Sequence, residues 1–244
     1  MLRTEVLFAG LTFNTIILGI LVGLNFVTTA SFESQWGYFT IQILPPICGT
    51  ITASFWRGVT LNLSRVTPFM LCAQQRPSFA QRTILMGYSP APAGPIDCLL
   101  SRNVSLSISG ALLILSGTIL GLKSALLNTV SWQTYWQANV TLWALYPLIA
   151  IYAAMNLLTL LLIWDMWGKC TGLRWDPICI ADHLALLKYA NFLDDFEGTD
   201  LSTRDSMIKE LGGQRYRLGY WNRGSKGTWY GFGRVENSSG KFIE

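Results

Sequence analysis

Leu142–Trp167 reads LWALYPLIAIYAAMNLLTLLLIWDMW, and this stretch decides the fold class of the chain. Its only charged residue, Asp165, lies near the end of the stretch. A helix needs about 20 mostly apolar residues to cross the hydrocarbon core of a bilayer. The stretch is long enough, so the sequence predicts a transmembrane helix here and an integral membrane protein.

Three other stretches have the same character and predict transmembrane helices at 6–28, 39–56 and 104–127. The second is the weakest, because it is short and contains Gln42 and the pair Pro45-Pro46. Charged residues lie only at the ends of these passes. We expect the long side chain of Lys123 to reach the lipid headgroups from such an end. The predicted fold is therefore an all-α membrane protein built around a four-transmembrane-helix bundle.

Charge is unevenly distributed and divides the chain in two. The 244 residues are 51% hydrophobic and 13% charged, and ten of the 14 acidic residues lie after Gly168. This predicts a membrane domain over 1–167 and a soluble C-terminal region over 168–244. The C-terminal region has eleven basic residues against ten acidic ones. That near balance lacks the clustered positive charge of a nucleic-acid-binding protein, so we expect no nucleic-acid partner.

The arginine distribution predicts the orientation in the membrane. The loop of residues 57–102 contains five arginines, Arg57, Arg65, Arg76, Arg82 and Arg102. The two loops at 31–38 and 129–141 contain neither lysine nor arginine. Because positively charged loops stay on the cytoplasmic side, we expect both termini and the 57–102 loop to lie in the cytoplasm. The membrane itself is expected to be the plasma membrane or an endomembrane.

The C-terminal region has the pattern of a small α+β domain. Asp176-Pro177 is typical of a helix start, and apolar spacing predicts an amphipathic helix through Phe196. A second, short helix is expected over Ser202–Leu211, followed by a β-hairpin of 214–221 and 228–235. Because this region is rich in aromatic and aliphatic residues, we expect it to fold against the 57–102 loop.

No catalytic or metal site can be assembled from the sequence. His183 is the only histidine, which excludes HExxH motifs and multi-histidine metal sites. The stretch Gly219–Lys226 has some residues of a phosphate-binding loop, but serine and lysine are exchanged and no helix is expected to follow. We therefore expect no enzymatic activity, no cofactor and no bound metal.

Two glycine motifs predict close helix packing. Gly19 and Gly23, and likewise Gly117 and Gly121, form GxxxG motifs that let helix backbones approach one another. We expect these faces to pack helices or to support oligomerisation. Cys170 follows the last pass closely and is a candidate for palmitoylation.

Several motifs resemble a known family. They include Ile43-Leu44-Pro45, Ser64-Arg65-Val-Thr-Pro68 and, in the tail, Arg217-Leu-Gly-Tyr-Trp221. Together they are similar to a repeat of fungal polytopic membrane proteins that is catalogued as a domain of unknown function. The resemblance extends over roughly residues 40–222. It implies a fungal, multi-pass membrane protein, and it supplies no activity and no site residues.

Two functions of different classes fit these observations. The first is a non-enzymatic membrane scaffold or adaptor that presents its tail to cytosolic protein partners. The second is a lipid- or small-solute-handling channel or transporter subunit. Ion-coupled transport is disfavoured, because no ionisable residue lies at the centre of a predicted pass. Membrane lipids are the expected surroundings in both cases.

Overall fold

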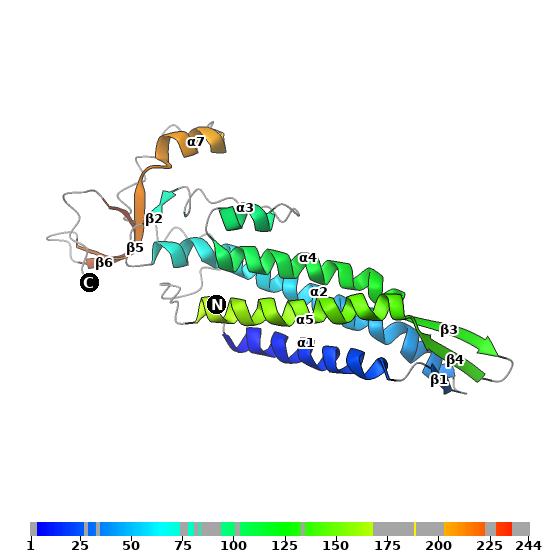
Figure 1. Cartoon of the computed structure of the whole chain (residues 1–244). Helices are drawn as coiled ribbons and strands as arrows, with labels where there is room; N and C mark the ends of the chain where they lie inside the picture. Colours follow the sequence, from blue (N-terminus) through cyan, green and yellow to red (C-terminus); the bar gives the residue numbers. More distant parts are fainter. Residues whose placement is uncertain are drawn as a thin grey trace. The chain divides into compact units, whose positions relative to one another are not determined.

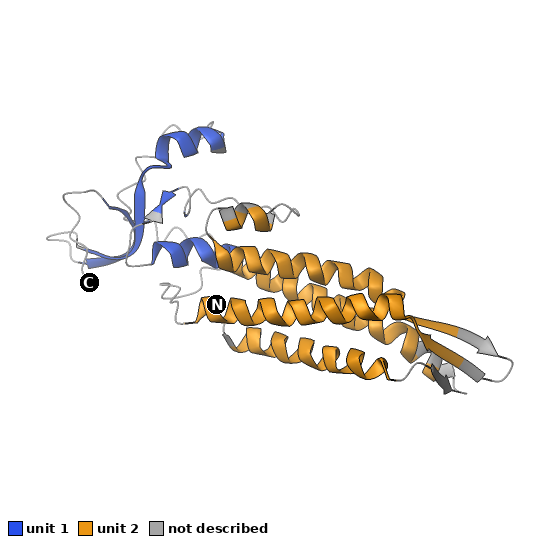
Figure 2. Ribbon diagram, in the orientation of Figure 1, with its two compact units in different colours: residues 1, 64–89, 168–244 blue, residues 2–63, 90–167 orange. Residues whose placement is uncertain are grey.

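A computed structural model describes residues 4–26, 29–32, 35–73, 78–80, 83, 94–100, 103–132, 135–167, 188, 203–222 and 228–235. The chain divides into two compact units (Figure 2). Unit 1 contains residues 1, 64–89 and 168–244, and unit 2 contains residues 2–63 and 90–167. Each unit is described separately below.

Unit 2 is built from long helices, which are α1 (Thr4–Leu24), most of α2 (Gln35–Cys72), α4 (Val104–Ser124) and α5 (Leu142–Met166). Helices α1 and α4 both pack against α5 (Figure 1). Three of the helices, α1, α4 and α5, are long and apolar enough to cross a membrane. By the length and composition of these three helices, the predictions of a mostly helical fold and of a membrane protein are confirmed.

The helices of unit 2 are apolar on the outside and carry polar residues on the inside. Large exposed side chains include Ile16, Ile20, Ile43, Leu44, Ile47, Ile51, Leu157 and Leu160. Buried polar residues, each at most 4% exposed, include Asn14, Thr52, Thr60, Ser109, Ser116, Lys123 and Thr159. Water-soluble proteins show the opposite distribution. Small polar residues at helix contacts are instead typical of membrane proteins, because lipid tails solvate the apolar exterior.

A small antiparallel sheet lies at one end of these helices (Figure 1). Strands β1 (Thr29–Phe32), β4 (Tyr135–Val140) and β3 (Leu127–Trp132) follow one another across it. The sheet occupies the segments that the sequence predicted as short loops. Threonine, valine and aromatic residues there favour strands. The first and third predicted passes, 6–28 and 104–127, therefore end a few residues early, where the chain turns into β1 and β3.

Helix α2 continues through Pro68, although a proline is a local signal for a helix to end. A proline inside a helix removes one backbone hydrogen bond and costs about 3 kcal/mol. The turn that follows Pro68 places Phe69 and Cys72 in the core of unit 1. Only 8% and 1% of these side chains are exposed. Their burial offsets the cost of the proline, so packing overrides the local stop signal.

Helix α3 (Gly94–Leu100) was not predicted, because the sequence before it is rich in proline. It packs on α4 at a position that requires glycine. A Cβ atom on Gly110 would lie 2.8 Å from Cγ of Pro95. The Ser107 hydroxyl also donates a hydrogen bond of 2.7 Å to the Pro95 carbonyl. The end of the predicted 57–102 loop is thus helical and held on α4.

Unit 1 combines a short helix with a three-stranded sheet. Helix α7 spans Arg204–Leu211, and the antiparallel strands follow the order β2 (Ser78–Phe79), β5 (Arg215–Asn222) and β6 (Thr228–Arg234). The predicted short helix and β-hairpin are confirmed. The predicted amphipathic helix from Asp176 to Phe196 lies outside the described residues.

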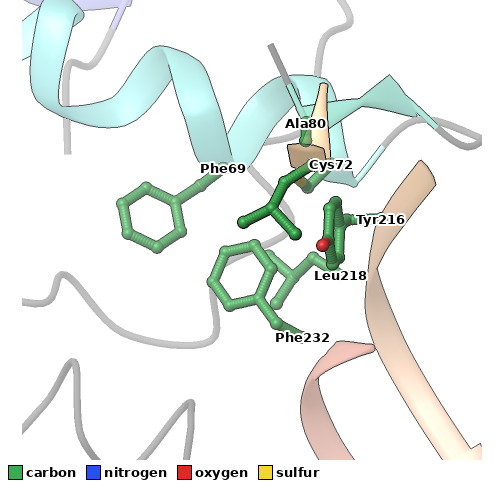
Figure 3. Close-up of a cluster of buried hydrophobic side chains, with 7 residues drawn as sticks. Phe69, Cys72, Ala80, Tyr216, Leu218 and Phe232 are labelled. Carbon is green, nitrogen blue, oxygen red and sulfur yellow. The ribbon is translucent and has the colours of Figure 1, made fainter. Parts of the chain in front are cut away.

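The core of unit 1 joins the tail to the 57–102 loop (Figure 3). Its members are Phe69, Cys72, Ala80, Leu211, Tyr216, Leu218 and Phe232. The rings of Phe69 and Phe232 lie 5.5 Å apart between centroids. For the described part of the tail, this cluster confirms that the tail folds against the loop, because both segments contribute buried side chains to it.

On the other face of the hairpin, Trp221 lies flat over a glycine of β6. A Cβ atom on Gly233 would lie 2.4 Å from two atoms of the Trp221 ring. The indole Nε1 of Trp221 donates a hydrogen bond of 3.1 Å to the Gly231 carbonyl. Trp221 also stacks on its cross-strand partner Trp229. Glycine at 233 is therefore a packing requirement of the hairpin.

Replacing Gly233 by alanine should destabilise unit 1 by about 1–3 kcal/mol, because the new methyl group overlaps the Trp221 ring. Hydrogen exchange across residues 203–235 of the purified full chain would measure the loss of protection. Gly213→Ala is the matched control, since a Cβ there meets nothing within 4 Å. Equal exchange in the two variants would contradict the proposed packing of Trp221.

Candidate functional site

Hydroxyl groups inside unit 2 are mostly satisfied by their own helix. Thr52 donates to the carbonyl of Cys48 at 2.7 Å, and Thr159 donates to that of Met155 at 2.7 Å. Thr60 differs, because its hydroxyl donates across to the Ser109 carbonyl at 3.0 Å and so joins α2 to α4. These residues stabilise helices and their contacts, and they do not form a catalytic set.

Lys123 is the exception among the buried polar residues, because it carries a formal charge. It belongs to the last turn of α4 and is only 4% exposed. Its ammonium nitrogen lies over the face of the Tyr152 ring on α5, 5.1 Å from the centroid. This geometry is a cation–π interaction, which becomes stronger where water is excluded.

Two residues of α2 complete the surroundings of Lys123 and Tyr152. A Cβ atom on Gly49 would lie 3.3 Å from Cδ of Lys123, so glycine leaves room for the lysine stem. The Thr52 hydroxyl lies 3.4 Å from the hydroxyl of Tyr152, which is fully buried. The lysine, the tyrosine and these α2 residues form a polar cluster where α2, α4 and α5 meet. We call it the Lys123 cluster.

The expectation that Lys123 reaches the lipid headgroups is wrong. In an α-helix each Cα–Cβ bond tilts toward the helix N-terminus. A lysine in the last turn of α4 is therefore directed back along the helix and away from the nearer end. Two sequence features could have pointed to this site. They are a lysine near the end of an apolar stretch, Lys123, and a glycine within a neighbouring one, Gly49.

Asp165 lies in the last turn of α5, in contact with α4. The Ser105 hydroxyl, in the first turn of α4, donates a short hydrogen bond to its carboxylate. The bond joins the start of α4 to the end of α5. Lys123 lies at the end of α4 and Asp165 lies beside its start, and both side chains make contacts within the protein.

The predicted GxxxG glycines lie on exposed positions of their helices. Around Gly19, Gly23, Gly117 and Gly121, a Cβ atom would meet nothing within 4 Å. Close approach occurs instead at other glycines, such as Gly10, where a Cβ would lie 2.5 Å from the Phe55 ring of α2. Packing through the GxxxG faces stays a prediction, and it would involve a second chain.

The cysteines show no site of thiol chemistry among the described residues. Cys48, Cys72 and Cys98 are free, and the last two are buried. Burial raises the pKa of the Cys72 thiol from 9.0 to about 12, against a smaller opposite effect of the hydrogen bond with Thr83. A thiol with so high a pKa is unreactive at neutral pH. Cys170, the candidate for palmitoylation, lies outside the described residues.

Within the part of the chain that the structure describes, no group of three or more histidine, cysteine, aspartate or glutamate side chains is placed to hold a metal ion. His183 is not among the described residues. The Lys123 cluster therefore stands as the candidate functional site, because it combines burial, a formal charge from α4 and hydroxyl groups from α2 and α5.

Comparison with known proteins finds a family model that matches part of the chain. Residues 39–128 match the model of a family described as a protein of unknown function (DUF3433). This confirms the resemblance to a domain of unknown function for the segment from α2 to the start of β3. The resembling motifs of the tail lie beyond the matched residues. No curated protein and no solved structure matches the chain.

The raised pKa of Cys72 predicts a pH dependence for unit 1. Above pH 9 the thiol ionises in the unfolded chain but stays protonated in the folded one until about pH 12. The unfolded state then binds fewer protons than the folded state. The contribution of Cys72 to the free energy of unfolding is therefore fully present below pH 9 and is lost as the pH rises toward 12. Relative to a Cys72→Ala variant, the free energy of unfolding should fall with a slope that approaches about 1.4 kcal/mol per pH unit. Thermal unfolding of both proteins between pH 8 and pH 11, followed by tryptophan fluorescence, measures it, and parallel profiles would contradict the assignment.

Proposed function

We propose that this protein is a non-enzymatic integral membrane scaffold or adaptor that presents unit 1 to cytosolic protein partners. The observation that carries the proposal is the core of unit 1. It is built from two segments far apart in sequence, and it makes the tail a folded module. A flexible tether would not need such a core.

The surface of the unit 1 sheet offers aromatic and basic side chains. Tyr220 is 43% exposed and packs edge-on against Tyr230, with ring centroids 5.1 Å apart. At the other end of β5, the Arg215 guanidinium lies 4.9 Å from the centroid of the exposed Phe79 ring. Tyrosine and arginine are enriched in protein interfaces, which supports a protein partner.

The scaffold proposal includes four passes with both termini in the cytoplasm. Residues 39–56 of α2 are the proposed fourth pass. Support comes from the exposed side chains of Ile43, Leu44, Ile47 and Ile51, whose spacing gives α2 an apolar outer face. The resemblance to fungal polytopic proteins supports a multi-pass chain of fungal origin, in the plasma membrane or an endomembrane. The arginines of the 57–102 loop support the cytoplasmic orientation.

A cysteine placed at Asn128 on β3 should react with a membrane-impermeant maleimide in intact cells. One placed at Lys209 on α7 should react only after permeabilisation. Both side chains are exposed, so access depends on the side of the membrane. The native cysteines are replaced by serine beforehand. Labelling of position 209 in intact cells, with position 128 protected, would reverse the orientation.

The scaffold proposal predicts that partner binding depends on the fold of unit 1. Leu218→Asp buries a carboxylate in its core, since Leu218 is 3% exposed. Proteins captured by the wild-type chain should be lost with this variant and retained with Gly213→Ala, the matched control. If all three chains capture the same proteins, unit 1 does not carry the interaction and the proposal is wrong.

A lipid- or small-solute-handling subunit is the second candidate, and the Lys123 cluster favours it. Charged residues inside membrane bundles often mark substrate paths. Purified protein in liposomes separates the two candidates. A scaffold leaves solute flux and lipid scrambling at the level of empty liposomes, whereas a transport subunit raises one of them above that level.

A further inference from the structure

Lys123 has no protein counter-ion among the residues that the structure describes. Two carboxylate side chains are described in unit 2. Glu5 is exposed in the first turn of α1, and Asp165 is bound to Ser105 at the opposite end of α4. The contact that Lys123 makes through its ammonium group is with the Tyr152 ring. Among the described residues, its positive charge therefore faces an aromatic quadrupole and no carboxylate.

A quadrupole alone is a weak partner for a buried charge. Removing an ammonium ion from water into a protein interior costs more free energy than a desolvated cation–π contact returns. A bound anion would supply the missing stabilisation, and the protein would then gain stability from that anion through linkage.

The Lys123 cluster also contains a hydroxyl donor that is weakly engaged. The Thr52 hydroxyl gives its proton to the Cys48 carbonyl at 2.7 Å. In its 3.4 Å contact with Thr52, the Tyr152 hydroxyl must then be the donor, and that hydrogen bond is long. An oxyanion accepts such donors together with an ammonium group.

The position of the cluster suggests the source of the anion. Lys123 lies in the last turn of α4, four residues before β3 begins at Leu127. In a chain that crosses the bilayer through α4, this turn lies near the phosphate groups of one leaflet. The Lys123 side chain points inward from the turn, against Tyr152, so a lipid phosphate must enter between α2, α4 and α5 to reach the ammonium group. Soluble phosphate has the same chemistry.

We propose that Lys123, together with Tyr152, binds a phosphate oxyanion at the junction of α2, α4 and α5, supplied by a membrane lipid or by soluble phosphate. Gly49 is the positioning residue, because its missing side chain leaves room for the lysine stem. This site is in unit 2 and does not depend on the partner binding proposed for unit 1.

The test uses the full chain in a sugar-headgroup detergent, which contains no phosphate. Phosphatidic acid is added in one arm, inorganic phosphate in a second, and diacylglycerol, the same lipid without phosphate, in a third. The wild-type Tm should rise by about 2–4 °C in one of the phosphate arms and stay constant with diacylglycerol. A rise with phosphatidic acid alone assigns a lipid ligand, and a rise with inorganic phosphate assigns a soluble one.

Variants separate the site from general effects of charge. Lys123→Met keeps most of the stem and removes the charge, so the rise should disappear. Lys209→Met removes an exposed lysine of α7 and should leave the rise unchanged. If Lys123→Met does not fold, Gly49→Ala replaces it, because its methyl group presses on the lysine stem and should reduce the rise. The proposal is overturned if the wild type gains nothing in either phosphate arm, or if the Lys123 and Gly49 variants gain as much as the wild type.

Discussion

The apolar outer faces of α1, α2, α4 and α5 impose the constraint on which unit 2 depends. Where lipid replaces water, a polar group must find its partner inside the protein. Thr52 and Thr159 meet this constraint through carbonyls of their own helices, and Thr60 meets it through the Ser109 carbonyl of α4. Polar residues therefore gather between the helices, and within the described part of unit 2 Lys123 is the charged residue that is buried with them.

Helix α2 supplies residues to both compact units. Thr52 and Thr60 belong to unit 2, whereas Phe69 and Cys72 lie in the core of unit 1. The tail strands bury Tyr216 and the rest of their inner face against these last turns of α2. Unit 1 consequently needs a segment that lies more than a hundred residues before the first strand of the tail, β5, which explains why Pro68 is tolerated inside the helix.

The two units carry different chemistry, and the proposals follow that division. Unit 1 offers a folded surface with exposed tyrosine and arginine, which suits a protein partner. Unit 2 offers a buried cation between three helices, which suits an anion. A scaffold that binds both a cytosolic protein and a lipid headgroup would connect its partner to the composition of the membrane.

The sequence by itself determined the features that depend on neighbouring residues. Long apolar runs predicted α1, α4 and α5, and local patterns predicted α7 and the hairpin of β5 and β6, because length and periodicity are local properties. Only the tertiary structure decided which glycines lie at close contacts, that the presumed loops pair as β1, β3 and β4, and that Lys123 turns inward. Each of these features depends on contacts between residues that are distant in the sequence. Local sequence patterns do not reveal which distant residues come into contact.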